Sequence, residues 1–138
     1  MQKPKTKKTI HKTMRLHNSL YTIQSKQSQD DAAQYVLILN AEHEIYKAHF
    51  PGRPITPGVC LLQIAKELLE DHSGSSLEIQ QIKNVKFLSV VSPIDQTRVT
   101  FDLNHIVVLP KEIECRAQVK SEDGQQLAKL SFKCAKRE

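Results

Sequence analysis

The segment from His49 to Gly58 restricts the fold more than any other part of the sequence. It reads His-Phe-Pro-Gly-Arg-Pro-Ile-Thr-Pro-Gly, so three prolines and two glycines fall within its last eight residues. Proline lacks a backbone donor and has a fixed φ, so this stretch can form neither a helix nor an inner strand. The chain has 138 residues, enough for one domain. A long, stiff loop within such a domain is typical of a functional site.

One long helix is predicted directly after this loop, from about residue 57 to residue 71. Pro57 suits its first turn, where no backbone donor is needed, and the Ser-Gly-Ser-Ser run that begins at Ser73 ends it. Its apolar residues recur at helical spacing and form one stripe: Leu61, Ile64, Ala65 and Leu68. The opposite face is polar and carries Gln63, Lys66, Glu67 and Glu70.

The rest of the chain has the pattern of an antiparallel sheet. Two strands are expected before the helix, at 19–27 and 34–40, the second buried on both faces. After the helix, apolar residues alternate with period two, which predicts a three- or four-stranded meander with one dry and one wet face. In this alternation His105 falls on the inward row. A sheet with one buried face needs a cover, so we predict an α+β fold in which the sheet wraps around the helix.

The positive charge is concentrated at the N-terminus. The chain has a formal charge of +5, but residues 1–15 carry six basic residues and no acidic one, and the remainder has a charge of −1. We therefore expect a flexible basic leader at 1–15 and a single domain at 16–138. A basic leader can bind polyanions without specificity. The sequence has no other feature of nucleic-acid recognition, so no nucleic-acid partner is expected.

Composition also restricts where the chain acts. No apolar run approaches the ~20 residues of a membrane span, so no membrane association is expected. The three cysteines, Cys60, Cys115 and Cys134, are odd in number and lack Cys-x-x-Cys spacing, which favours a reducing cytoplasm. The histidines have no clustered partners, so we expect no metal site.

The loop and the helix start together offer a definite chemistry. His49 lies immediately before a Phe-Pro-Gly turn, which restricts the direction of its ring. The helix start presents free backbone N–H groups, and Gly58 has no side chain to keep a ligand carbonyl away. A histidine beside N–H groups that bind a carbonyl oxygen is suited to removing a proton next to a thioester.

These residues resemble the signature of the FabZ/FabA-type 3-hydroxyacyl-[acyl carrier protein] dehydratases, which have the hotdog fold. A second stretch, Lys86 to Asp95, resembles the strand and turn after the family's helix. The resemblance implies that His49 removes the C2 proton. It also implies that Gly58, next to Val59, polarises the thioester carbonyl. It implies a homodimer or a larger assembly of dimers, an acyl carrier protein with a phosphopantetheine-linked acyl chain as partner, and no cofactor.

The sequence departs from this family at one chemically important position. The family has a Glu or Asp on the helix, four residues after the position of Val59, and this chain has Gln63 there. An amide can orient the departing hydroxyl but cannot give it a proton. Glu67, one turn further along the helix, is a candidate substitute acid. Lys47 and Arg53 flank the motif and are candidate contacts for the acidic carrier.

Three functions are therefore open at the level of sequence. The first is dehydration of a 3-hydroxyacyl thioester to a trans-2-enoyl thioester, in fatty-acid synthesis or in specialised polyene or lipid synthesis. The second is a non-catalytic subunit that binds acyl thioesters and pairs with an active paralogue, which Gln63 alone favours. The third is a hotdog thioesterase, although the helix lacks the carboxylate that this chemistry usually needs at the site.

Overall fold

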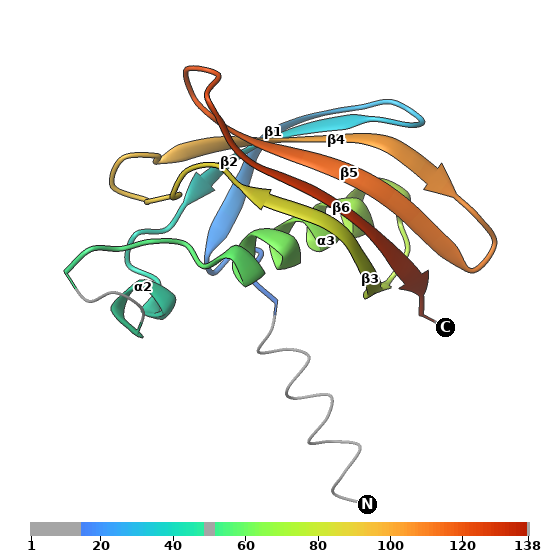
Figure 1. The fold of residues 1–138 in the computed structure, drawn as a ribbon, viewed down its shortest axis with the longest axis horizontal. Coiled ribbons are helices and arrows are strands. Elements are labelled where there is room, and N and C mark those ends of the chain that lie inside the picture. The colour runs from blue at the N-terminus through green and yellow to red at the C-terminus, as the bar shows by residue number, and fades with distance from the viewer. Residues whose placement is uncertain (1–14, 49–51, 138) are drawn as a thin grey trace, which may run out of the picture.

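The computed structural model describes residues 15–48 and 52–137, and contains one curved sheet with a long helix along one face (Figure 1). The predicted leader, except Arg15, and the residues His49 and Phe50 lie outside the described residues. In chain order the elements are β1 (Tyr21–Ser28), β2 (Ala33–Leu39), α2 (Glu44–Ala48), α3 (Gly58–Ser73), β3 (Leu77–Phe87), β4 (Arg98–Val108), β5 (Glu112–Ser121) and β6 (Gln126–Lys136).

The sheet is antiparallel throughout, but its strand order differs from a simple meander. The order is β1-β2-β4-β5-β6-β3, so β1 and β2 are neighbours, β4, β5 and β6 follow one another, and β3 lies apart from both β2 and β4. The prediction that β3 joins β4 by a tight turn is wrong. Residues 88–97 instead carry the chain from one edge of the sheet to its middle, and β3 pairs with β6. A periodic sequence indicates which face of a strand is buried but not which strand lies beside it.

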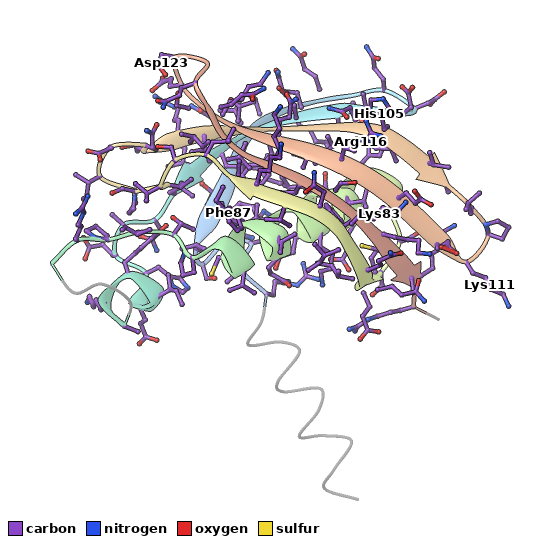
Figure 2. The ribbon with its side chains drawn as sticks, in the orientation of Figure 1. Lys83, Phe87, His105, Lys111, Arg116 and Asp123 are labelled. Carbon is purple, nitrogen blue, oxygen red and sulfur yellow. The ribbon has the colours of Figure 1, made fainter. Side chains whose placement is uncertain are left out.

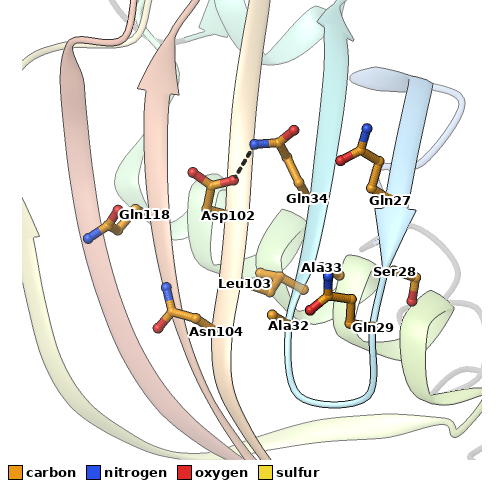
Figure 3. A pocket seen from close by; sticks show the side chains of 10 residues that line it. All are labelled: Gln27, Ser28, Gln29, Ala32, Ala33, Gln34, Asp102, Leu103, Asn104 and Gln118. Carbon is orange, nitrogen blue, oxygen red and sulfur yellow. Dashed lines mark hydrogen bonds between the residues drawn. The ribbon is translucent and has the colours of Figure 1, made fainter.

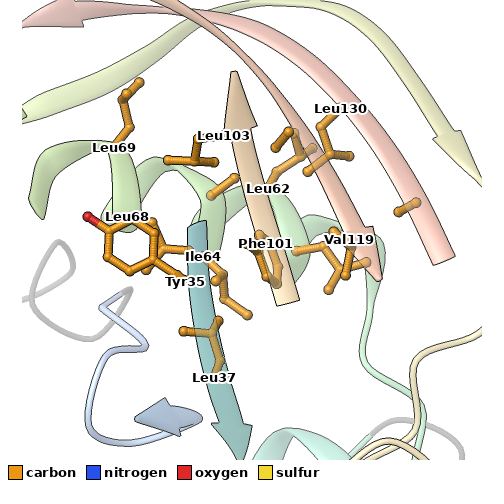
Figure 4. Packing of buried hydrophobic residues seen from close by; sticks show 14 of the residues in the cluster. Tyr35, Leu37, Leu62, Ile64, Leu68, Leu69, Phe101, Leu103, Val119 and Leu130 are labelled. Carbon is orange, nitrogen blue, oxygen red and sulfur yellow. The ribbon is translucent and has the colours of Figure 1, made fainter. Parts of the chain in front are cut away.

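The core lies between α3 and the inner face of the sheet (Figure 4). Aromatic rings from three strands, Tyr35, Phe101 and Phe132, are fully buried there. The predicted apolar stripe of α3 packs against them, and Ile64, Ala65 and Leu68 have no exposed surface. Gly74 ends the helix in the left-handed conformation with φ of 72°, and its N–H bonds to Glu70 O at 2.8 Å, which confirms the predicted stop.

The polar face predicted for α3 is only partly exposed. Gln63, Lys66 and Glu70 are half-buried, whereas Glu67 is 4% exposed. The segment that precedes β1 lies over this side of the helix, and its residues Leu16 and His17 bond to Glu67. Helical periodicity did not predict the burial of Glu67, because the segment that covers it lies about fifty residues away in the sequence.

His105 faces solvent, which corrects the expectation that it points inward. Between Asn104 and Val107 the register of β4 against β5 shifts, so that two residues of β4 face one residue of β5. His105 takes the left-handed conformation at this bulge, with φ of 50°. The extra residue reverses the alternation, so Ile106 is buried and Val107 is 47% exposed.

Two local expectations about the chain before α3 also differ from the structure. Strand β2 is buried on one face only, with Gln34 exposed and Val36 half-buried, because the helix covers only one side of the sheet. The charged stretch before the loop contains the short helix α2, which its few apolar residues did not predict. Within the described residues, no helix is long and apolar enough to cross a membrane.

Candidate active site at the start of the central helix

The start of α3 presents backbone donors that the helix itself does not use. Pro57 is the N-cap, and the first intrahelical bonds run to its carbonyl from Cys60 N at 2.9 Å and Leu61 N at 3.3 Å. Gly58 and Val59 come before these bonds, so their N–H groups have no acceptor in the preceding turn. Val59 is 67% exposed, which leaves this end of the helix open to a ligand.

Gly58 lies in close contact with another side chain, so any side chain at this position would displace its neighbour. The ring of Phe87, at the end of β3, lies directly against its Cα. A Cβ on residue 58 would be 2.8 Å from Cε2 and 2.9 Å from Cε1 of that ring, and closer still to Cζ. Phe87 itself is 53% exposed at the edge of the sheet. Its ring therefore forms one wall beside the free N–H groups.

A buried hydrogen bond joins a residue of α2 to a residue just before α3. Tyr46 of α2 and Thr56, just before α3, are both buried, and their hydroxyl oxygens lie 2.8 Å apart. Thr56 N also donates to Val91 O at 2.7 Å. Burial raises the pKa of Tyr46, which keeps its proton available for this bond. The sequence placed Tyr46 in the core but gave no signal that it would pair with Thr56.

Gln63 and Glu67 lie one turn apart on α3 and are directly bonded. The Gln63 amide nitrogen donates to Glu67 Oε2 at 2.7 Å. Val59, Gln63 and Glu67 follow one another at four-residue spacing, so they share one side of the helix. Along this side the exposure falls from 67% at Val59, through half-buried Gln63, to 4% at Glu67. The side is thus open at the helix start and closed at Glu67.

The remaining residues predicted around the site lie at its rim or in the core. Lys47 and Arg53 are exposed on either side of the motif, where a partner can reach them. Cys60 is 7% exposed, and burial raises the pKa of its thiol, as expected for an inert cysteine.

A cavity of about 400 Å³ lies on the outer face of the sheet, away from α3 (Figure 3). Half of its lining residues carry side-chain amides, from β1, β2, β4, β5 and the turn after β1, and Gln34 bonds to Asp102 there at 2.9 Å. None of the described site residues lines this cavity, since they belong to α2, α3 and the loop on the other side of the sheet. The predicted site is therefore the helix start and not the outer cavity.

An antiparallel sheet wrapped along one long helix defines a hotdog-fold protein. The sequence profile of the ApeI-like family, described as ApeI dehydratase, matches residues 24–137. The chain belongs to this family. Both the predicted hotdog fold and the predicted kinship with FabZ/FabA-type dehydratases are confirmed.

The sequences of individual relatives are similar to this chain over only part of their length. A 3-hydroxyacyl-[acyl-carrier-protein] dehydratase FabZ of Chloroflexus aggregans is 30% identical over 76 residues, which are 50% of this chain and 53% of that protein. A FabZ of Ligilactobacillus salivarius is 33% identical over 70 residues, 46% of this chain and 50% of that protein. The matched part of the chain spans about half the length of these relatives.

Solved structures show the same fold at low identity. The dehydratase heterocomplex ApeI:P of Xenorhabdus doucetiae contains a chain with a TM-score of 0.67 and 16% identity, covering 83% of this chain and 96% of that one. A hypothetical thioesterase of Streptococcus pneumoniae, determined with coenzyme A, has a TM-score of 0.60 and 11% identity, with 85% of each chain covered. At these identities the comparisons establish the fold alone.

The contact between Gly58 and Phe87 can be tested by a double-mutant cycle. We expect Gly58→Ala to destabilise the protein by about 1–2 kcal/mol, because the new methyl group displaces the Phe87 ring. In a Phe87→Ala background the cost should vanish or change sign, since alanine is the better helix former. Urea unfolding followed by circular dichroism measures all four variants. Equal costs in both backgrounds would contradict a steric origin.

Proposed function

We propose that this protein dehydrates a 3-hydroxyacyl thioester, carried by acyl carrier protein, to the trans-2-enoyl thioester. The base is His49, which takes the proton from C2 while the N–H groups of Gly58 and Val59 bind the thioester oxygen. The electron pair of the C2–H bond forms the C2–C3 double bond, and the C3–O bond breaks. The proton held by His49 passes to the departing hydroxyl, which leaves as water.

The open start of α3 is the observation that supports this proposal most. A thioester carbonyl needs donors that are free, accessible and fixed in direction, and the first N–H groups of α3 meet all three conditions. Gly58 has no side chain of its own, and the ring of Phe87 lies beside it as one wall of the site. Gln63 follows on the same side of the helix as Val59. The bond between Tyr46 and Thr56 links the described residues on the two sides of His49 in the sequence.

Membership of a dehydratase family points to a lyase, while the thioesterase resemblance rests on fold alone. A dehydratase needs a proton acceptor and a polarised carbonyl, both of which the motif supplies. A thioesterase needs an attacking water or carboxylate at the carbonyl. Gln63 cannot serve as either, so dehydration is the better supported reaction. The cytoplasmic location remains a prediction.

A second copy of the chain is the partner that the exposed edge of the sheet best accommodates. β3 is an edge strand with unpaired backbone groups on one side. Ile82 and Phe87 on β3, together with Val59 on α3, are each more than half exposed, although the register places Ile82 opposite the buried Phe132. An apolar strip along an open edge is typical of an interface. Pairing there would enclose the helix start.

A different hotdog chain is the alternative partner. The similar Xenorhabdus structure is a dehydratase heterocomplex, and Gln63 stands where FabZ/FabA-type dehydratases have a carboxylate. In such a pair this chain would bind the acyl thioester, and the partner would supply the acid.

Dehydratase activity is tested with purified protein and 3-hydroxyacyl carrier protein, followed by enoyl-thioester absorbance. We expect turnover by the wild type and loss of at least about 100-fold in His49→Ala, because the base is removed. His72→Ala, at the other end of α3, is the matched control and should keep wild-type turnover. A folded but inactive wild type would favour the subunit alternative.

Carrier recognition is tested by reversing charge at the loop. We expect Lys47→Glu combined with Arg53→Glu to raise KM for the carrier-linked substrate about 10-fold, with stronger effect at low salt. The same substrate on free pantetheine should be converted normally. Lys111→Glu, at the end of the molecule away from α2, is the control (Figure 2). An equal loss with both substrates would show that the two residues do not contact the carrier.

The proposed interface is tested by placing a charge on the β3 edge. We expect Ile82→Lys to weaken self-association at least 30-fold, because an unpaired buried ammonium costs more than about 2 kcal/mol. Gln81→Lys adds the same charge on the outer face and should leave the dimer intact. Sedimentation equilibrium measures both. A dimer that survives Ile82→Lys would place the interface elsewhere.

A further inference from the structure

The carboxylate of Glu67 accepts four hydrogen bonds, so it is not arranged as an exposed acid. Its Oε1 accepts from His17 N at 2.8 Å and Tyr21 Oη at 2.9 Å. Its Oε2 accepts from Leu16 N at 2.8 Å and Gln63 Nε2 at 2.7 Å. Each oxygen therefore has two donors, and the residue is 4% exposed. The carboxylate has no hydrogen to offer in any of these four contacts.

The surroundings of Glu67 determine which way the Gln63 amide is turned. Two of the donors are peptide N–H groups, which cannot act as acceptors. The third is the hydroxyl of Tyr21, whose pKa is raised by burial and by Glu67, so it keeps its proton. A carboxylate filled in this way accepts only another donor. The NH₂ group of Gln63 must face Glu67, and its carbonyl oxygen must point away.

We propose that Glu67 is a positioning residue that fixes the Gln63 carbonyl oxygen as a hydrogen-bond acceptor for the substrate's 3-hydroxyl. This inference rests on the proposed dehydration. The open direction from Gln63 is toward Val59 and the helix start, because the Glu67 side is closed by the segment before β1. The substrate hydroxyl donates its hydrogen to Gln63, and its oxygen keeps its lone pairs free for the proton that His49 returns.

The same geometry explains how a glutamine fits where FabZ/FabA-type dehydratases have a carboxylate. A carboxyl group at residue 63 would meet the Glu67 carboxylate at hydrogen-bond distance, and two such groups cannot both be ionised. One proton would be held between them, and the pKa of the pair would rise. Glutamine makes the same donation to Glu67 with a hydrogen that does not titrate.

Other charged groups lie around Glu67 and must stay constant in any comparison. The charged side chains Arg15, Glu70 and Asp71, and the titratable side chains His17 and Tyr21, line a cavity of about 410 Å³ together with Glu67, which itself is only 4% exposed. Arg15 lies 3.7 Å from Glu70, and Lys26 lies 2.8 Å from Asp71. Variants confined to residues 63 and 67 keep all of these groups in place.

The decisive measurement is a ¹³C NMR titration of Gln63→Glu, which needs no turnover. We expect an apparent carboxyl pKa at least about 1.5 units above the ordinary glutamate value of about 4.3. In Gln63→Glu with Glu67→Gln the upward shift should disappear, because the neighbouring charge is gone. Gln80→Glu, on the exposed part of β3, is the control and should titrate near the ordinary value. An ordinary pKa for Glu at residue 63 beside an intact Glu67 would overturn the proposal.

The kinetic measurement distinguishes positioning from mere stabilisation. In Glu67→Gln the new amide can face Gln63 with either end, so Gln63 loses its fixed orientation. We expect kcat to fall about 10- to 100-fold with KM changed less than about twofold. Tyr21→Phe removes a different bond to Glu67 and keeps the Gln63 contact, so its kcat per folded molecule should stay within about threefold. Equal losses of kcat in both variants would indicate a structural role only.

The two proposals can fail separately. A raised pKa in Gln63→Glu without any dehydratase activity in the wild type would retain the positioning of Gln63 and reject the proposed reaction. Activity that depends on His49, together with an ordinary pKa in Gln63→Glu, would retain the reaction and reject the role of Glu67.

Discussion

The packing of α3 on the single covered face of the sheet is the constraint on which the rest of the structure depends. One helix of 16 residues must shield the inner face of six strands. It does so with a broad apolar surface, so even Leu62 and Leu69 beside the central stripe are buried. A helix of that width still leaves the β3 edge and its own first turn uncovered. The exposed side chains of Val59, Ile82 and Phe87 follow from this shortage of cover.

The uncovered region coincides with the functional elements. The helix start needs access to a ligand, and it lies where the sheet provides no shield. The opposite half of α3 is closed by the segment from Leu16 to Tyr21, which Glu67 holds in place with three hydrogen bonds. One side of a single helix thus passes from an exposed start at Val59 to a covered carboxylate at Glu67 within about two turns. Gln63 lies between the helix start and Glu67. Its amide nitrogen faces Glu67, and in our proposal its carbonyl oxygen faces the helix start.

The position of Gln63 beside Glu67 restricts which hydrogen bonds its amide can offer to a ligand. An exposed glutamine would turn freely and would offer a substrate either a donor or an acceptor. Bonding to a carboxylate that is already filled by peptide donors removes that choice. In the proposed reaction, the departure from the FabZ/FabA pattern replaces a titratable acid by an oriented acceptor, and His49 carries out both proton transfers.

The sequence by itself determined the strands, the long helix α3 and the segment of the candidate site, because these depend on local rules, although it did not predict the short helix α2. Periodicity predicted α3 and its buried stripe, the Pro-Gly pairs predicted the loop, and the motif around His49 and Gly58 identified the dehydratase kinship. Tertiary structure decided what depends on distant parts of the chain. The pairing of β3 with β6, the reversal at His105, the contact of Phe87 with Gly58 and the burial of Glu67 each join residues that no local pattern relates. Side-chain alternation predicts which face of a strand is buried. Which strands pair, and which side chains meet, depends on how distant segments pack together in the folded protein.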